Sequence, residues 1–216
     1  LGVSGRLFEY PVCDRFEVVV TRLGTNSLAH GWNYADLLAP YWRWYLNRRA
    51  GAAIRCGQTW LSLDPGILYL IPAWLSFASR STGIIEHTYM HCEVRGLPGP
   101  SVRTCFTAPM ALPEARYQAS ELAVIGAELA AGAVPGPAMV LRARAVADAS
   151  LAMALTRLGP TQRALLAPDW HRGPLAGVLS FLHADPTVPA TNRDLARIAG
   201  CTPDHLVRRF RSALGQ

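Results

Sequence analysis

The stretch TNRDLARIAGCTPDHLVRRFRSALG, residues 191–215, predicts two short helices joined by a tight turn. Thr191 can cap the first helix, and Asp194 follows three residues later, as in an aspartate version of the capping box. Gly200 can take a positive φ and end that helix. Thr202 can cap the second helix. Two capped helices around a glycine turn predict a helix-turn-helix.

Both predicted helices separate apolar from polar residues. The apolar positions recur at helical spacing, and they are Leu195, Ile198 and Ala199 in the first helix and Leu206, Phe210 and Leu214 in the second. The other face of the second helix carries Asp204, Val207, Arg208 and Arg211. Such a face can enter the major groove of DNA. The same spacing also fits a helical hairpin packed inside an ordinary domain.

The segment resembles the first helix-turn-helix of AraC/XylS-type transcription regulators, whose pattern is roughly t-x-x-[DE]-L-A-x-x-[AL]-G-x-[ST]-x-x-x-L-x-R-x-F-[KR]-x-x-x-G. The matching residues are Thr191, Asp194, Leu195, Ala196, Ala199, Gly200, Thr202, Leu206, Arg208, Phe210, Arg211 and Gly215. Two residues depart from it: Asn192 replaces an apolar residue, and Asp204 stands where a base-reading side chain often sits. The resemblance implies a sequence-specific transcription regulator that binds double-stranded DNA under the control of a small-molecule effector.

Five residues of this segment are expected to bind DNA. Arg208 can bind guanine O6 and N7 with both guanidinium nitrogens, and Val207 can contact a thymine methyl group. Arg211 and Thr202 are expected to hold phosphates, which fix register without reading sequence. Asp204 can accept a hydrogen bond from cytosine N4, or it can stabilise the helix N-terminus through the helix dipole.

Composition is compatible with this function. The chain has 216 residues, enough for one large or two small domains, and its net charge of +6 suits a polyanionic partner. Its five cysteines are scattered and form no CxxC pair, which argues against a disulfide scaffold or a zinc site and favours a cytoplasmic protein. No membrane span and no signal peptide are expected. Since the family carries two helix-turn-helix units, we expect the sequence to be incomplete at its C-terminus.

The resemblance implies an α+β protein in three parts. Residues 1–107 would form a cupin-like jelly-roll β-barrel that binds the effector, and LDPGILYLIP, residues 63–72, resembles a turn of that barrel. Short strands are expected at 18–20, 41–49 and 87–96, and two more within 59–72 on either side of an Asp64-Pro65-Gly66 turn. A polar turn is expected after Gly24. Residues 108–170 would form a helical linker, and 171–216 a three-helix unit containing the helix-turn-helix.

The linker region is rich in alanine and predicts an antiparallel helix pair. One helix would begin near residues 113–114 and carry Leu122, Ile125 and Leu129, and the next would span residues 138–158. This pair can pack on its own barrel, or it can form the dimerisation surface of a homodimer, as the resemblance implies. A further helical piece at 174–184 would begin the DNA-binding unit.

An effector cavity is expected in the barrel. Barrel mouths with aromatic walls and few polar groups are ordinary small-molecule sites. The candidate residues are Arg43, Trp44, Trp60, His87, Tyr89 and His91. An arginine among aromatic rings would suit an anionic ligand such as a carboxylate, or a sugar. Each aromatic residue can instead simply fill the interior, and Arg43 can form a surface ion pair.

The sequence predicts neither catalysis nor a metal site. His87 and His91 lie four residues apart, which on a strand places them on one face with Tyr89 between them. There is no H-x-H pair, and no third metal ligand is evident. Nucleophile-elbow and glycine-rich phosphate-loop motifs are also absent. We therefore expect no catalytic residues, no metal and no cofactor.

Two other classes of function remain open at this stage. One is a cupin enzyme, metal-dependent or metal-free, or a sugar-binding protein with a helical tail. The other is an interaction module that dimerises through residues 108–160. Stoichiometric metal after purification would favour the enzyme, and insensitivity of DNA binding to Arg208→Ala would favour the interaction module.

Overall fold

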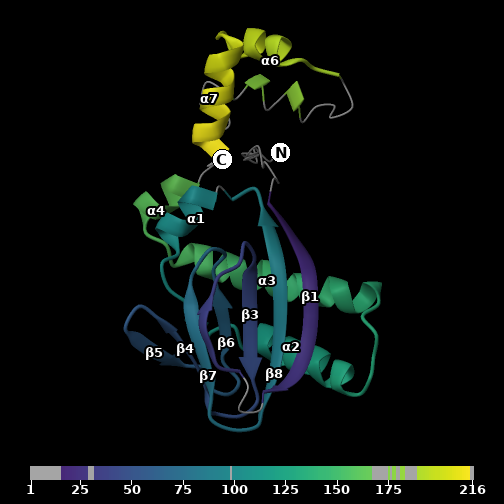
Figure 1. Cartoon of the computed structure of the whole chain (residues 1–216). Coiled ribbons are helices and arrows are strands. Elements are labelled where there is room, and N and C mark those ends of the chain that lie inside the picture. Colours follow the sequence, from purple (N-terminus) through teal and green to yellow (C-terminus); the bar gives the residue numbers. More distant parts are fainter. Residues whose placement is uncertain are drawn as a thin grey trace, which may run out of the picture.

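The protein has an α+β fold, as the sequence predicts (Figure 1). The structure is a computed structural model that describes residues 16–28, 32–97, 99–166, 175, 177–178, 181–182 and 189–214. The rest of the helical piece expected at 174–184 lies outside these residues. No described helix combines the length and the apolar character needed to cross a membrane.

The larger of two antiparallel sheets has five strands. In spatial order they are β1 (Glu17–Leu28), β8 (Ile85–Arg95), β3 (Trp42–Asn47), β6 (Leu68–Ile71) and β9 (Met110–Leu112). The register of β1 against β8 shifts by one residue between Val20 and Arg22, so Thr21 is the extra residue of a bulge. This bulge decides which side chains of β1 face each side of the sheet.

The smaller sheet has four strands and faces the larger one. Its order is β2 (Tyr34–Leu37), β7 (Phe77–Ser81), β4 (Ala52–Cys56) and β5 (Thr59–Ser62). Buried residues of both sheets meet between them, among them Tyr45 and Ile71 from the larger sheet and Ile54 and Phe77 from the smaller. Within the described ranges the two sheets stay separate. The expected closed barrel is therefore an open two-sheet sandwich.

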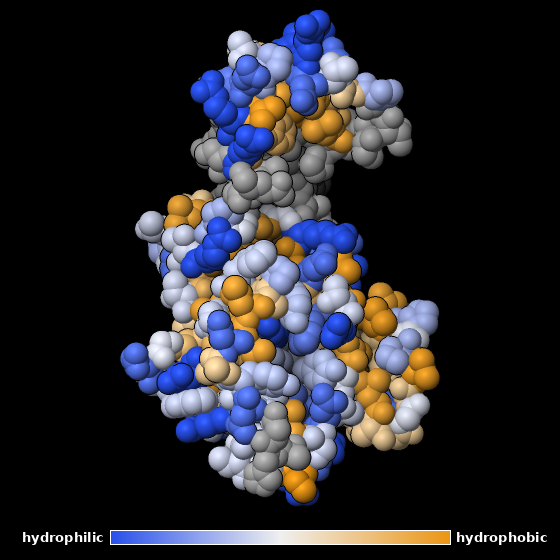
Figure 2. Space-filling model, viewed as in Figure 1, coloured by the Kyte–Doolittle hydropathy of each residue, from blue (hydrophilic) through white to orange (hydrophobic). Residues whose placement is uncertain are grey.

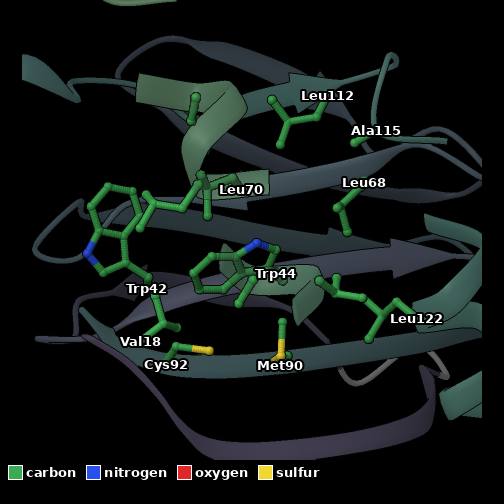
Figure 3. Packing of buried hydrophobic residues seen from close by; sticks show 14 of the residues in the cluster. Val18, Trp42, Trp44, Leu68, Leu70, Met90, Cys92, Leu112, Ala115 and Leu122 are labelled. Carbon is green, nitrogen blue, oxygen red and sulfur yellow. The ribbon is translucent and has the colours of Figure 1, made fainter. Parts of the chain in front are cut away.

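Helices cover the opposite face of the five-stranded sheet. Figure 1 shows α2 (Arg116–Ala130) and α3 (Pro137–Thr156) crossing behind it. Their apolar residues pack against inward side chains of the strands, including Trp42 and Trp44 of β3 (Figure 3). Two short helices, α1 (Gly99–Cys105) and α4 (Pro160–Leu166), pack on each other. The helix pair thus lies on its own sheet, one of the two arrangements that the sequence left open.

Three boundaries differ from the sequence prediction. The polar turn expected after Gly24 is strand, because residues 24–28 pair with β8 as far as Ile85. The short strand β9 falls inside the region expected to be helical, where it pairs with β6. Helix α2 begins at Arg116 instead of 113–114, since the Ala115 amide bonds to the Leu112 carbonyl in the preceding turn.

The C-terminal helices follow the predicted helix-turn-helix. In α6 (Asn192–Ile198) the Thr191 hydroxyl accepts the Asp194 amide at 3.3 Å, and Asp194 accepts the Thr191 amide at 3.1 Å. Gly200 has a φ of 61° and ends the helix before α7 (Pro203–Leu214). Both the capping box and the glycine stop are confirmed.

A separate small core holds these helices together. It contains Leu206 of α7, Ala196 of α6, and Leu175 and Val178 from the segment before them, with Phe210 partly buried beside it. Ile198, expected in this core, is 42% exposed. Ala196 of the same helix is buried in this core instead.

Candidate effector cavity and candidate nucleic-acid interface

A cavity of about 270 Å³ lies on the face of the five-stranded sheet that the helices do not cover. Three rows of paired residues cross β1, β8 and β3 on this face, and they are Arg22–His91–Arg43, Gly24–Tyr89–Tyr45 and Asn26–His87–Asn47. Trp32, Tyr34, Leu37 and Tyr41 complete the wall. The site thus has a cationic end, an aromatic middle and a polar end.

Arg43 dominates the cationic end. The residue is only 4% exposed, and its Nη1 has no hydrogen-bond partner within the described residues. Its guanidinium lies over two aromatic rings, at 4.8 Å from the centroid of Tyr41 and 5.0 Å from that of Phe77. These cation–π contacts offset part of the cost of burying the charge, but they do not supply a hydrogen-bond acceptor.

His91 lies beside Arg43 and shares its aromatic neighbour. The imidazole stacks on Tyr41 with ring centroids 4.6 Å apart, and its buried Nδ1 also lacks a partner in the described part of the chain. Burial, and then the charges of Arg43 and Arg22, lower the pKa of His91 to about 4. The ring is therefore neutral at pH 7 and can donate one hydrogen bond.

The middle of the cavity is built from tyrosines. Tyr89 lies over the backbone of Gly24, where an added Cβ would come within 2.7 Å of the phenol oxygen. Glycine is therefore needed at this position for Tyr89 to lie flat along β1. Tyr45 is buried beside it, and that burial raises the pKa of its phenol. Tyr45 thus stays neutral, and both tyrosines present ring surface to the cavity.

At the polar end, a hydrogen-bond chain fixes the tautomer of His87. Asn47 donates from Nδ2 to the Leu63 carbonyl at 3.2 Å, which leaves its Oδ1 to accept from His87 Nδ1 at 2.7 Å. His87 therefore carries its proton on Nδ1, and Nε2 is an acceptor. Burial, and then His91, lower the pKa of His87 to about 3, so this ring is also neutral.

The structure brings together four of the six predicted effector residues, namely Arg43, His87, Tyr89 and His91. Trp44 lies on the opposite face of β3, where its Nε1 donates to Ser150 Oγ of α3 at 2.6 Å. Trp60 lies on β5, between Arg80 at 4.0 Å and Arg55 at 5.4 Å. Neither tryptophan lines the cavity.

Sequence reasoning missed several residues of the wall. Tyr45 could have been found, because it stands two positions from Arg43 on one strand and so shares its face. Arg22 could not, because the bulge at Thr21 reverses the alternation that Val18 and Val20 begin. Trp32 and Tyr41 lie in connections, where periodicity says nothing.

A larger hollow of about 490 Å³ at the ends of β1 and β8 has different electrostatics. Its charged lining residues are Arg22, Glu93 and Arg95, and Arg95 already pairs with Glu93 at 3.5 Å and with Glu17 at 2.9 Å. No acidic residue lines the smaller cavity within the described ranges. The smaller cavity is therefore the stronger candidate for an anionic ligand.

Metal-binding side chains do not gather in the described part of the chain: no group of three His, Cys, Asp or Glu residues lies close enough to hold an ion. His87 and His91 lie on one strand face, as predicted, but Tyr89 separates them, with ring centroids 5.9 Å and 5.1 Å away. Aromatic stacking is the contact that the structure gives both histidines.

The second candidate site is the outer face of α7. Asp204, Arg208 and Arg211 are exposed, whereas Leu206 on the opposite side is buried. Figure 2 shows hydrophilic side chains along this outer side of α7 and over α6, with a hydrophobic patch between them. The described residues 189–214 contain five arginines and two aspartates, so the surface is electropositive.

The other two predicted DNA-binding residues have additional contacts. Thr202 caps α7, because its hydroxyl accepts the His205 amide at 3.3 Å. Val207 is partly buried and, with Arg211, borders a shallow apolar hollow shared with Leu195 and Phe210. The structure therefore places Asp204, Arg208 and Arg211 on the open face of the helix and Val207 at its edge.

Comparison with known proteins returns similar folds only. No model of a known protein family matches the chain, and neither does any curated protein sequence. An apo ToxT variant from Vibrio cholerae strain SCE256 aligns with a TM-score of 0.43 and 9% identity over 93% of this chain and 76% of that one. The AraC-like transcriptional activator CuxR aligns with a TM-score of 0.41 and 14% identity over 91% and 70%.

Proposed function

We propose that this protein is a sequence-specific DNA-binding transcription regulator controlled by a small-molecule effector. The observation that carries the proposal is the division of α7 into two faces. Leu206 and Phe210 attach the helix to α6, while Arg208 and Arg211 are directed to solvent. A helix attached by one face and basic on the other can lie in a major groove.

Within this proposal, the residues of α7 divide into those that read bases and those that hold phosphates. Arg208 reads a guanine and Val207 contacts a thymine methyl group. Arg211 binds phosphate, and the Thr202 hydroxyl does so while capping the helix. For Asp204 we favour stabilisation of the N-terminus of α7, because it lies in the first helical turn.

The sandwich would supply the regulation, and no catalytic role is proposed for it. The cavity beside Arg43 would bind a sugar or a carboxylate, without a metal or another cofactor. Strand β3 can relay its occupancy, since Arg43 and Tyr45 face the cavity while Trp44 bonds to Ser150 of α3. A ligand changes activity only if it binds one arrangement better than another.

We further propose a homodimer that acts in the cytoplasm. Exposed apolar side chains gather where α2 and α3 meet their connecting loop, and they include Val134 at 85% exposure and Leu141 at 65%. Figure 2 shows hydrophobic residues gathered over this end of the helix pair, to the right of the sheets. An exposed apolar patch of this kind is typical of a surface that another protein covers.

The test is DNA binding by the full chain. Selection from a random duplex library should yield a preferred site, and fluorescence anisotropy then measures affinity for it. Arg208→Ala should weaken binding to the preferred site by about 1–3 kcal/mol and relax selectivity at one base pair. Arg103→Ala, which removes the same charge from an exposed position on α1, is the matched control.

Two results would refute the proposal. One is a selection that recovers no preferred sequence even at low salt. The other is equal weakening by Arg208→Ala and Arg103→Ala, which would mean that net charge alone attracts DNA.

A further inference from the structure

We propose that the cavity on the five-stranded sheet selects a small aromatic carboxylate, with the carboxylate held by Arg43 and His91 and the ring lying against Tyr89 and Tyr45. The inference deepens the proposed effector role of this cavity and rests on it. It assigns a chemical class to the ligand, where the proposed function leaves both a sugar and a carboxylate open.

The charge of Arg43 is buried next to the cavity. A guanidinium that is 96% buried is costly unless an anion or several acceptors accompany it, yet Nη1 has no partner within the described residues. No acidic side chain among the described residues lines the cavity. The nearby Glu93 is already paired with Arg95. No described residue supplies an anion that complements Arg43, so we infer that a ligand supplies it.

The hydrogen-bond donors of Arg43 and His91 lie on adjacent strands at paired positions. Arg43 and His91 are directly paired across β3 and β8, and Arg22 is paired with His91 from the other side. Side chains at paired positions start about 5 Å apart. His91 Nδ1 and Arg43 Nη1 are both buried and unpartnered in the described structure, so each can donate to one oxygen of the same carboxylate.

The middle row of the cavity, Gly24–Tyr89–Tyr45, is aromatic. Tyr89 and Tyr45 present ring surface, and Trp32 lies edge-on to Tyr45 with centroids 5.9 Å apart. Aromatic groups stack favourably on such walls. A sugar would need many polar partners, but among the described residues the polar end offers the cavity only Asn26 and His87. Asn47 does not line the cavity and is committed to His87 and the Leu63 carbonyl. An aromatic body therefore fits better than a polyhydroxylated one.

The volume of the cavity limits the size of its ligand. Ligand cavities commonly hold about 300–1,000 Å³, and this one, at about 270 Å³, is at the small end. A single ring with a carboxylate fits this space, whereas a long acyl chain does not.

The experiment measures binding of defined probes to the full chain by isothermal titration calorimetry. Benzoate and phenylacetate are the carboxylates, benzamide and benzyl alcohol are their uncharged counterparts, and L-arabinose represents sugars. We expect the carboxylates to bind at one site per chain. Benzamide and benzyl alcohol should bind at least about tenfold more weakly, because they lack the charge-assisted hydrogen bonds.

Variants of the chain test whether Arg43 and His91 bind the carboxylate. Arg43→Met should weaken benzoate binding at least about tenfold, and Arg43→Lys should restore part of it, because it returns the charge without the fork. Arg103→Met removes an exposed arginine of α1 and should leave binding unchanged. Circular dichroism and thermal melting verify that each variant is folded. His91→Gln, which keeps a donor amide, should lose less than His91→Leu.

Several outcomes would overturn the inference. They are equal affinity for benzamide and benzoate, unchanged benzoate binding by folded Arg43→Met, tighter binding of L-arabinose than of benzoate, and no carboxylate binding at about 10 mM, a concentration at which even weak specific sites fill.

Failure of this inference is distinguishable from failure of the proposed function. Carboxylate binding without any effect on DNA affinity would remove the effector role and leave the ligand assignment intact. A change in DNA affinity on adding L-arabinose, with no benzoate binding, would remove the ligand assignment and leave the effector role intact.

Discussion

The cavity and α7 both present arginine, in opposite settings. Arg43 is buried among aromatic rings, with one nitrogen unpartnered in the described part of the chain, whereas Arg208 lies in solvent on the open face of a helix. Burial makes a charge costly when it is unpaired but strengthens its interaction with a matching ion. Exposure makes a charge inexpensive and easily screened by salt.

The contrast shows how one residue type can serve two kinds of recognition. A buried guanidinium selects its ligand by desolvation and fixed geometry, so binding there should depend little on salt. An exposed guanidinium works through the density of phosphates, so binding there should fall steeply with salt.

The largest effect should come from a substitution that disrupts the packing of α2 on β8 and leaves α7 unchanged. Gly126 of α2 lies against Thr88 of β8, and a Cβ there would come within 2.2 Å of the threonine hydroxyl. Gly126→Val should therefore push α2 off the sheet and lower the free energy of unfolding by about 4 kcal/mol. Urea denaturation followed by tryptophan fluorescence measures it. Gly83→Ala, with open space around it and no positive φ, should change stability by less than about 0.5 kcal/mol.

The next largest effect should show whether Arg43 destabilises the folded protein when no ligand is bound. Replacing an unpaired buried charge by an apolar side chain of similar length should stabilise the protein, so Arg43→Met should raise the free energy of unfolding by about 2 kcal/mol without ligand. Chemical denaturation checks this. A destabilised Arg43→Met protein would mean that the contacts with Tyr41 and Phe77 make Arg43 a structural residue.

Acid should destabilise the protein through His91 of the cavity. Folding lowers the pKa of His91 from 6.5 to about 4, so the unfolded chain binds more protons than the folded one in this window. Stability is therefore complete above pH 6.5 and should fall toward pH 4, by up to about 1.4 kcal/mol per pH unit for this histidine. Urea midpoints against pH measure the slope. His91→Gln should reduce it, and an unchanged slope would contradict the assignment.

The smallest effect belongs to the exposed phosphate contact. Arg211→Ala should weaken DNA binding almost equally on all sequences, by less than about 1 kcal/mol at moderate salt. It should also reduce the slope of log affinity against log salt by about 1. A salt titration of anisotropy measures the slope. A change of base preference instead would assign Arg211 to base reading.

Local signals in the sequence predicted the C-terminal helices well. A cap such as Thr191 with Asp194 involves residues three apart, and Gly200 acts at its own position, so no distant partner is needed. The strand role of residues 24–28 could not be predicted in this way. Those residues form a strand only because β8, far along the chain, pairs with them.

The cavity was predictable in part for a similar reason. His87, Tyr89 and His91 alternate along one strand, so their common face follows from the sequence. The same rule separates Arg43 from its neighbour Trp44, which belongs to the helix-facing core. Which strands pair, and so which side chains meet across them, depends on long-range contacts that periodicity does not contain.

The bulge at Thr21 has a consequence for how this protein can diversify. Ahead of it, Val18 and Val20 face the helices, and beyond it Arg22 and Asn26 face the cavity. Deleting Thr21 would remove the bulge and still leave Arg22 opposite His91, because Arg22 would then follow Val20 in regular alternation. A change in length by one residue can therefore be absorbed at this point, whereas elsewhere in β1 it would exchange the helix-facing and cavity-facing side chains.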